Sequence, residues 1–375
     1  MLRTLAVSGY RSLRDVVVPL GELTVVTGPN GSGKSNLYRA LRLLAATSRG
    51  DVIGTLAREG GLPSVLWAGP EDGGGMQGTV RRRPLAVQLG YASDELGYLV
   101  DLGIPQASQE SMFARDPEIK REQVFAGRVA KPSTLLIDRT RQSTRVRDDA
   151  WTVLDQRLSP DESIVTDLVD GDAAPELLTL RRTMDAWRFY DHFRVDLDAP
   201  ARMPQVGTRS HTLAHDGADL AATWATIVEA GQGDALDRAV DEAFPGSRVR
   251  ITASDGLFRL TIQQPGLLRP LEAAELSDGT LRYLLLCAAL LPARPAPLLV
   301  LNEPEASLHP SLLGPLARLV RVASERTQVI TVSHADDLVS ALPDSARVEL
   351  RRSEAETVVD GQGFLDVPAW NWGSR

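Results

Sequence analysis

Residues 27–36 read TGPNGSGKSN, and no other segment says more about the architecture of this chain. The segment fits the pattern G-x-x-x-x-G-K-[ST], with Gly28, Gly33, Lys34 and Ser35 at the specified positions. An apolar run, LTVVT, comes directly before it, and leucines at helical spacing follow from Lys34 onward. The sequence therefore predicts a strand, a glycine-rich loop and a helix in direct succession.

The loop has the composition needed to bind phosphate. Glycines let the backbone curl so that N–H groups point inward, and the helix N-terminus adds a partial positive charge. We expect Lys34 to reach the β- and γ-phosphates of a nucleotide and the Ser35 hydroxyl to ligate Mg²⁺. The residues expected to contact the nucleotide are Asn30, Gly31, Ser32, Gly33, Lys34, Ser35 and Asn36. A glycine turn without a ligand fits less well, because the motif, the strand and the helix occur together.

Three further segments in the second half of the chain suit the same chemistry. Residues 275–286, ELSDGTLRYLLL, place Ser277 and Gly279 at the start of an apolar helix, where free N–H groups can bind a phosphate. Residues 298–310, LLVLNEPEASLHP, and 328–338, QVITVSHADDL, each begin as a buried strand and end in polar residues. Ligands bind at the carboxyl ends of parallel strands, so we expect these polar ends to face the phosphates.

The order of these motifs resembles that of the ABC-type ATPase heads of the RecF, SMC and OLD families. More narrowly, the chain resembles the stand-alone bacterial AAA-family ATPases of that group. The phrases that carry this closer resemblance are WRFYDHF, DGADLAA, ELSDGTLRYLLL and LNEPEASLHP, which lie within residues 187–310.

The resemblance implies a role for each motif. ELSDGT is the signature motif, LLVLNEPE the Walker B strand and EASLH the D-loop. Glu303 is the catalytic carboxylate, His334 the switch histidine, and Asn302 stands where an aspartate usually helps to hold Mg²⁺. ATP and Mg²⁺ are the implied cofactors. Two subunits are expected to join head to tail around ATP, with Ser277 of one completing the site of the other.

The sequence departs from the family pattern at several positions. Asp278 replaces the first glycine of L-S-G-G-Q, so an anion lies at a helix N-terminus that should face phosphate; a side chain turned away from that end resolves the conflict. Neither Gln88 nor Gln123 can be assigned as the Q-loop residue. Heptads are missing, so no SMC-like arm is expected. A TOPRIM pattern is missing too, so the nuclease activity of the OLD group is not carried over.

The predicted fold is α/β: a P-loop NTPase of the ABC-ATPase head type, with a mixed central sheet, an antiparallel flanking sheet and a partly helical insertion. Residues 1–147 are expected to form lobe I with the flanking sheet, residues 148–245 a mainly helical insertion, and residues 246–375 lobe II. Helical spacing in the insertion predicts a helix through PELLTLRRTMDAWRFYDHF, residues 175–193. Its aromatic residues, beside several arginines, could stack nucleic-acid bases. A core-facing helix explains them better.

Composition limits the partners. The 375 residues are 43% hydrophobic, which is ample for a packed core, and the net charge of −8 provides no global attraction for nucleic acid or acidic lipid. No apolar run of about 18 residues occurs, so we expect a cytoplasmic protein without membrane contact. The single cysteine, Cys287, lies in an apolar run and is expected to be buried.

These observations predict a slow ATPase that acts as a molecular switch, in DNA repair or phage defence. The alternative is a nucleotide-gated binding module with negligible turnover, which presents a surface to an effector protein. Both DNA and an effector protein remain open as partners beyond the homodimer.

Overall fold

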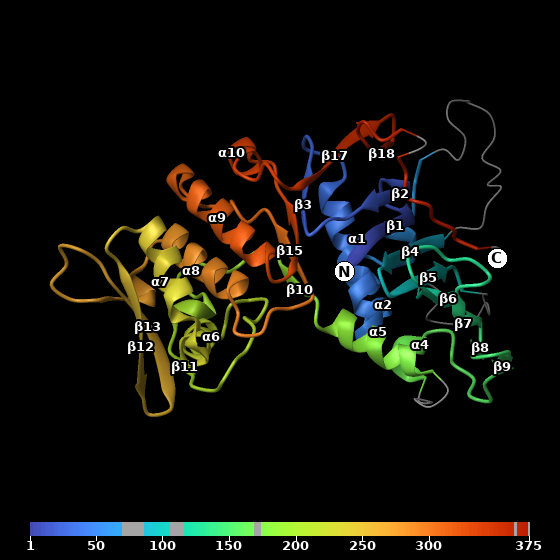
Figure 1. The fold of residues 1–375 in the computed structure, drawn as a ribbon, viewed down its shortest axis with the longest axis horizontal. Coiled ribbons are helices and arrows are strands. Elements are labelled where there is room, and N and C mark those ends of the chain that lie inside the picture. The colour runs from blue at the N-terminus through green and yellow to red at the C-terminus, as the bar shows by residue number, and fades with distance from the viewer. Residues whose placement is uncertain (70–85, 106–115, 169–173, 364–365, 374–375) are drawn as a thin grey trace. The chain divides into compact units, whose positions relative to one another are not determined.

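The computed structural model describes residues 1–69, 86–105, 116–168, 174–363 and 366–373 (Figure 1). The chain forms two compact units. The first consists of Met1–Gly21, Val26–Trp187 and Arg347–Arg375, and the second of Glu22–Val25 and Arg188–Ala346. The sequence motifs divide the chain differently, into lobes 1–147 and 246–375 around an insertion. That division stays a prediction.

The first unit is built on an eight-stranded antiparallel sheet with the order β2-β1-β4-β5-β6-β7-β8-β9. Its strands are β1 (Leu2–Tyr10), β2 (Leu13–Pro19), β4 (Ala86–Ser93), β5 (Leu96–Gly103), β6 (Glu118–Ala126), β7 (Leu135–Thr140), β8 (Ser143–Arg147) and β9 (Trp151–Val153). The antiparallel sheet expected in lobe I is therefore present.

A network of buried polar groups lies between this sheet and the start of a short helix. Glu122 of β6 and Arg139 of β7 form an ion pair of 2.7 Å with both side chains fully buried. Glu122 also accepts hydrogen bonds from the Ser163 hydroxyl and the Ile164 N–H, at the start of helix α4 (Ile164–Asp167). Because every partner is hydrogen-bonded, the pair connects the sheet to this helix without leaving a lone buried charge.

The helix that follows the glycine-rich loop begins where the sequence predicts. Helix α1 spans Lys34–Ala46, with Leu37, Leu41 and Leu44 buried, and a 3-10 turn, η1 (Thr47–Arg49), carries the chain to Gly50 in the left-handed region. The other elements of this unit are α2 (Val52–Arg58), α3 (Leu62–Val65), α5 (Pro175–Asp185), β17 (Ala346–Ser353), whose first residue belongs to the second unit, and the antiparallel partner of β17, β18 (Glu356–Val359).

The second unit has a parallel sheet at its centre. Strand β15 (Leu298–Asn302) lies between β10 (Arg188–Tyr190) and β16 (Gln328–Val332), and both pairs are parallel. Strand β3 (Leu23–Thr27), which leads into the glycine-rich loop, is next to β16, and the Val329 N–H donates to the Glu22 carbonyl. Neighbouring strands of this parallel sheet come from distant parts of the sequence, as is typical of α/β proteins.

Strand β10 differs from the helix expected over residues 175–193. Helix α5 ends at Asp185, and residues 188–190 pair in parallel with Leu299–Leu301 of β15. The apolar spacing continued a helical pattern, but pairing with a distant strand decided the local structure. Trp187, Tyr190 and Phe193 are buried, so the core interpretation of the aromatic cluster is correct even though the predicted helix is too long.

Helices cover the sheet of the second unit. They are α6 (Leu220–Ile227), the π-helical turn η3 (Val228–Gln232), α7 (Gly233–Ala243), α8 (Asp278–Leu290), α9 (Leu313–Ser324) and α10 (Asp336–Ser340), with short 3-10 turns η2 (Pro200–Arg202), η4 (Ala273–Glu275) and η5 (Pro310–Leu312). Helix α8 packs against α6, α7 and α9 (Figure 1), and all of its residues from Leu281 to Leu290 are buried.

A small antiparallel sheet completes the second unit. It contains β11 (Gln205–Val206), β12 (Arg248–Ser254), β13 (Leu257–Gln263) and β14 (Leu271–Glu272). Among the described residues, no helix is both long enough and apolar enough to span a bilayer.

Candidate functional site: a phosphate loop and a cluster of strand ends

In the first unit, the glycine-rich loop adopts a tight conformation that depends on glycine. Gly28, Gly31 and Gly33 all have positive φ, at 140°, 81° and 106°. A Cβ at Gly28 would lie 2.1 Å from the Leu350 carbonyl oxygen, and one at Gly33 would lie 2.1 Å from Thr357 Oγ1. The loop therefore needs glycine at these two positions for space as well as for backbone conformation.

A chain of hydrogen bonds holds the loop from outside. Asn36 Nδ2 donates to Ser12 Oγ (2.8 Å), Ser12 Oγ is 2.7 Å from Thr357 Oγ1, and Thr357 Oγ1 donates to the Ser32 carbonyl (2.8 Å). Ser12 comes from the β1–β2 turn and Thr357 from β18, so the two ends of the chain fix the loop. The sequence motif gave no sign of either residue.

The two residues expected to act on phosphate and metal differ in exposure. Lys34 is buried, and its Nζ donates to the carbonyls of Gly28 (2.5 Å) and Pro29 (3.1 Å). Ser35 is exposed in the first turn of α1, where helical N–H groups have no partner within the helix. The arrangement provides donors and an exposed hydroxyl for a polyphosphate and its cation.

In the second unit, the Walker B residues lie at the carboxyl end of β15. The Glu303 N–H donates to the Val332 carbonyl (2.8 Å), so the parallel pairing with β16 extends one residue beyond the strand. Glu303 has a φ of 48°, in the left-handed region that a non-glycine residue rarely adopts. Its carbonyl accepts a hydrogen bond from Arg282 Nη2 (3.1 Å), which helps to hold this backbone conformation.

His334 lies beside this carboxylate. Its Nδ1 is 3.7 Å from Glu303 Oε1 and 3.6 Å from Glu305 Oε1, and about half of the imidazole is exposed. Glu305 is buried, and it accepts hydrogen bonds from the Ser333 hydroxyl (2.6 Å) and the His334 N–H (3.0 Å). Glu305 thus positions the turn that carries the histidine, a role that the sequence did not reveal.

Arg282 of α8 contacts the Walker B backbone at the Glu303 carbonyl. It is buried, and burial lowers the pKa of its guanidinium. Three nearby carboxylates oppose that pKa shift, and they belong to Glu305, Asp191 and Glu303. The cluster thus has more acidic than basic groups, which favours a cation or a positively charged ligand.

Asn302 is held by a residue that was not predicted from the sequence. Its Nδ2 donates to Asp191 Oδ1 at 2.7 Å, and Asp191 follows β10, the strand next to β15. The Asn302 Oδ1 is buried and has no hydrogen-bond partner among the described residues. A buried acceptor oxygen without a partner suits Mg²⁺ or one of its bound waters. The residues present therefore fit the expected metal.

The signature segment begins a helix as expected, but Ser277 rather than Asp278 caps it. Ser277 accepts a hydrogen bond from the Thr280 N–H at the N-terminus of α8. The Asp278 carboxylate forms an ion pair of 2.7 Å with Arg202, whose side chain is almost entirely buried. The anion at this position is thus turned toward a cation, which removes the conflict with a phosphate ligand. A Cβ at Gly279 would lie 3.2 Å from the Ser307 carbonyl oxygen, so the D-loop runs close to this end of the helix.

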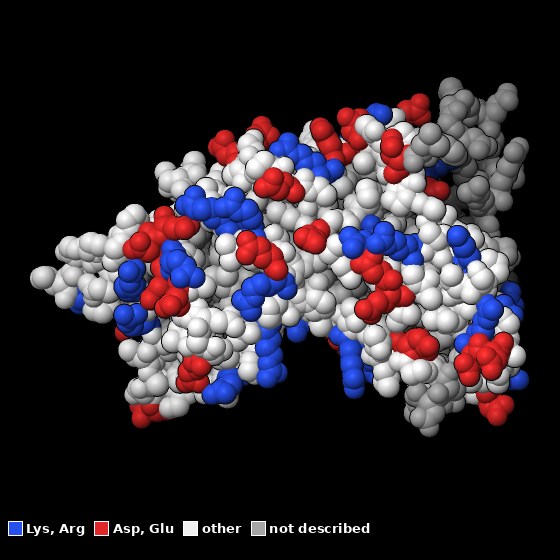
Figure 2. Space-filling model, in the orientation of Figure 1, with Lys and Arg blue, Asp and Glu red and all other residues white. Residues whose placement is uncertain are grey.

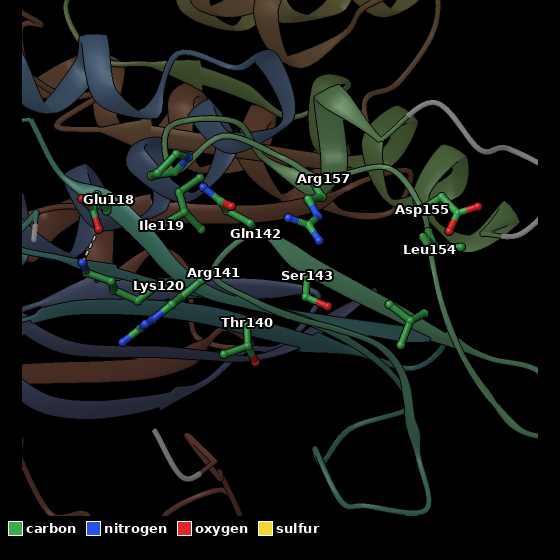
Figure 3. A pocket seen from close by; sticks show the side chains of 12 residues that line it. Glu118, Ile119, Lys120, Thr140, Arg141, Gln142, Ser143, Leu154, Asp155 and Arg157 are labelled. Carbon is green, nitrogen blue, oxygen red and sulfur yellow. Dashed lines mark hydrogen bonds and ion pairs between the residues drawn. The ribbon is translucent and has the colours of Figure 1, made fainter.

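The two candidate Q-loop glutamines and a cavity in the first unit give no indication of a catalytic role. Gln88 Nε2 donates to Asp101 and Gln123 Nε2 to Asp138, so both amides are used between strands of the antiparallel sheet. A separate cavity of about 760 Å³ in the first unit (Figure 3) contains Lys120, Arg141 and Arg157, but also Glu118 and Asp155. Lys120 is ion-paired with Glu118, and the mixed charges select no ligand class.

Known structures share this fold. An SMC head bound to the C-winged helix domain of ScpA superposes with a TM-score of 0.51 at 15% identity, covering 96% of this chain and 97% of that one. An SMC head with an extended coiled coil from Pyrococcus furiosus, bound to the C-terminal domain of ScpA, gives 0.50 at 14% identity, covering 96% and 95%. The predicted fold, an α/β head of the ABC-ATPase type, is therefore confirmed.

Known sequences give a shorter and a longer match. A stretch of 44 residues is 48% identical to the OLD nuclease of Thermus scotoductus, covering 12% of this chain and only 8% of that relative. Residues 23–340 match the family described as "AAA domain, putative AbiEii toxin, Type IV TA system". The chain belongs to this AAA family, as a P-loop ATPase that resembles the RecF, SMC and OLD group.

Proposed function

We propose that the chain is an ATP-binding and ATP-hydrolysing molecular switch of the RecF/SMC/OLD type. The observation that carries this proposal is the loop after β3, with three glycines at positive φ and Lys34 at the start of α1. Such a loop aims backbone N–H groups and one ammonium at a polyphosphate.

The roles proposed for the loop residues follow from their surroundings. Lys34 exchanges the carbonyls of Gly28 and Pro29 for the β- and γ-phosphates, and the exposed Ser35 hydroxyl is a ligand for Mg²⁺. Bound Mg²⁺ neutralises the charge that develops on the phosphates. The N–H groups of residues 30–36 bind the phosphate oxygens.

Hydrolysis is assigned to the strand ends of the second unit. Glu303, which is 42% exposed, orients the attacking water or accepts its proton. His334 is close enough to respond to the same carboxylate and acts as a sensor of the γ-phosphate. Asn302 offers an oxygen without a charge, and turnover is therefore expected to be slow.

Dimerisation around ATP is part of the proposal. Ser277 and Gly279 lie at an exposed helix N-terminus, and the Asp278 charge is directed to Arg202. This end of α8 can therefore approach a phosphate on a second copy of the chain.

A role in DNA repair or phage defence is proposed from the family and from the short match to an OLD nuclease. On the face shown in Figure 2, basic and acidic side chains are interspersed. Any DNA contact is therefore expected to be weak and sensitive to salt. An effector protein is the alternative partner.

The test compares ATP binding, thermal midpoint and single-turnover hydrolysis in three proteins, and adds DNA to the wild type. Lys34→Ala should lose ATP binding with little change in thermal midpoint. Glu303→Gln should retain ATP binding, with single-turnover hydrolysis about 10² to 10⁴ slower than in wild type. Acceleration of the wild type by DNA supports a repair-type ATPase, and no acceleration supports a switch gated by a partner protein.

Two outcomes contradict the proposal. If Lys34→Ala binds ATP as tightly as wild type, the loop is not the nucleotide site. If wild type binds ATP but hydrolyses none at any Mg²⁺ concentration, the chain is the nucleotide-gated binding module instead.

A further inference from the structure

Asp191 and Asn302 occupy neighbouring ends of two parallel strands. The register pairs Tyr190 with Leu301, so the next residue on each strand reaches the same edge of the sheet. There Asn302 Nδ2 donates to Asp191 Oδ1 at 2.7 Å. Two segments 111 residues apart in the chain are thus joined by one hydrogen bond at the position where a Walker B strand ends.

The hydrogen bond determines the orientation of the amide. A carboxylate can only accept, so the NH₂ group of Asn302 must face Asp191 and its Oδ1 must face away. That Oδ1 is buried and has no partner in the described part of the chain. Leaving a buried acceptor without a partner is costly, which indicates that a donor or a cation belongs there.

We propose that Asp191 is a positioning residue for the magnesium of the ATP site, and that Asp191 and Asn302 together replace the usual Walker B aspartate. Asn302 supplies the oxygen that faces the ion or one of its waters. Asp191 supplies the negative charge and fixes the amide. The inference rests on the proposed ATPase function and adds a residue to its metal site.

The charged groups around the pair agree with this assignment. Glu303 and Glu305 interact electrostatically with Arg282, as Asp191 does. His334 faces Glu303 and Glu305. Arg282 therefore interacts with three carboxylates, so acidic groups that suit a divalent cation gather at the end of the Walker B strand even though that strand ends in an amide.

The decisive experiment exchanges the two side chains. Mn²⁺ replaces Mg²⁺ as the probe, and its binding in the presence of a non-hydrolysable ATP analogue is measured by electron paramagnetic resonance. The variants are Asp191→Asn, the exchange Asp191→Asn with Asn302→Asp, and Asp196→Asn as the control. Asp196 is an exposed aspartate of the same unit, ion-paired with Arg194, so it undergoes the same chemical change away from the cluster.

Removing a residue that orients a metal ligand typically costs 10- to 100-fold in metal affinity, and we expect about tenfold for Asp191→Asn because the phosphates supply other ligands. The exchange variant should return to within about twofold of wild type, because it again holds one carboxylate and one amide in contact. Asp196→Asn should match wild type.

Two results would overturn the assignment: Mn²⁺ affinity unchanged in Asp191→Asn, or no recovery in the exchange variant. If Asp191→Asn does not fold, the single variant Asn302→Asp tests the assignment through its thermal midpoint. It would place two carboxylates in contact, so its metal-free thermal midpoint should fall below that of wild type and recover with Mn²⁺ and nucleotide. An unchanged midpoint also refutes the role of Asp191.

Failure of the proposed function gives a different pattern. Binding of a fluorescent ATP analogue to wild type, measured without metal, is the first step. If wild type binds no nucleotide, the ATPase proposal fails. If wild type binds nucleotide and Mn²⁺ while Asp191→Asn behaves identically, only the role of Asp191 fails.

Discussion

The glycines of the phosphate loop differ in why a side chain is unfavourable at each position. Gly31 has a φ of 81° and open space around its missing Cβ, whereas Gly33 has a φ of 106° and Thr357 Oγ1 at 2.1 Å from that point. Of these two glycines, only Gly33 is needed for the loop to pack closely against β18. The sequence motif marks Gly33 but leaves Gly31 unspecified, in agreement with this difference.

This contrast gives a first prediction. Gly31→Ala should cost about 1 to 2 kcal/mol, because only the left-handed backbone is penalised. Gly33→Ala should cost more and should also weaken ATP binding, since displacing Thr357 breaks the hydrogen bonds that run from Asn36 to Ser32. Thermal midpoints and ATP titrations of both variants measure the difference. Equal loss of ATP binding in the two variants would contradict it.

Cys287 provides a second prediction at the same scale. Its side chain is completely buried in α8, as expected from its apolar surroundings, and burial raises the pKa of its thiol. The reactive thiolate is therefore scarce at pH 8, and reagents lack access. We expect no labelling of the native protein by a thiol reagent and one label per chain in denaturant. Fast labelling in the native state would show that α8 opens readily.

At the scale of elements, the ends of helices and strands were easier to predict from the sequence than the long-range contacts between elements. The start of α1 at Lys34 and the cap of α8 at Ser277 depend on residues close in sequence, and both are present. Glu303 and His334 lie close together, as expected, because each follows the carboxyl end of a parallel strand at the same edge of the sheet. The roles of these residues in catalysis remain predictions.

The missed residues all depend on long-range pairing. Asp191 follows a strand that reads as the end of a helix, and its importance appears only when β10 lies beside β15. Ser12 and Thr357 are 345 residues apart and meet under the loop. The signal that could have identified Asp191 is a short segment with two aromatic residues, RFY, that is followed by an acidic residue, as LLVL is followed by Asn302 and Glu303.

A third prediction concerns the attachment of α8. Arg202 donates to Asp278 and to the carbonyls of Val195, Asp196, Ala273, Ala274 and Leu276. Arg202→Met should lower the free energy of unfolding by about 3 kcal/mol or more, because an unsatisfied buried group costs about 1 to 3 kcal/mol.

Asp278→Asn is the matched control for this variant. Asp278 is 64% exposed, so loss of its charge should cost at most about 1 kcal/mol. Denaturant titrations of both variants compare the two effects. A larger loss in Asp278→Asn than in Arg202→Met would mean that the ion pair, rather than the carbonyl contacts, anchors the segment.

At the scale of the whole molecule, the proposed ATPase draws on both units. The phosphate loop belongs to the first, and Glu303, His334 and Ser277 belong to the second. Strand β3 is shared, since Glu22–Val25 count with the second unit and Val26 onward with the first. Because the loop follows β3 directly, a change at the phosphates has a covalent path into the sheet that carries Glu303. A switch driven by ATP requires such a connection.

The last prediction is dimerisation on ATP. Glu303→Gln should accumulate the ATP-bound state, and light scattering should then report about twice the 40.6 kDa of one chain. Adding Lys34→Ala should keep the mass at one chain, because no nucleotide is held. Ser277→Asp preserves the helix cap, since aspartate caps as well as serine does, but it places an anion where a phosphate must approach. It should therefore block dimerisation while leaving the thermal midpoint close to that of its parent, so that loss of the dimer cannot be attributed to unfolding. An ATP-bound Glu303→Gln variant that remains a single chain would refute the head-to-tail arrangement, and Ser277 would then have only its capping role in α8.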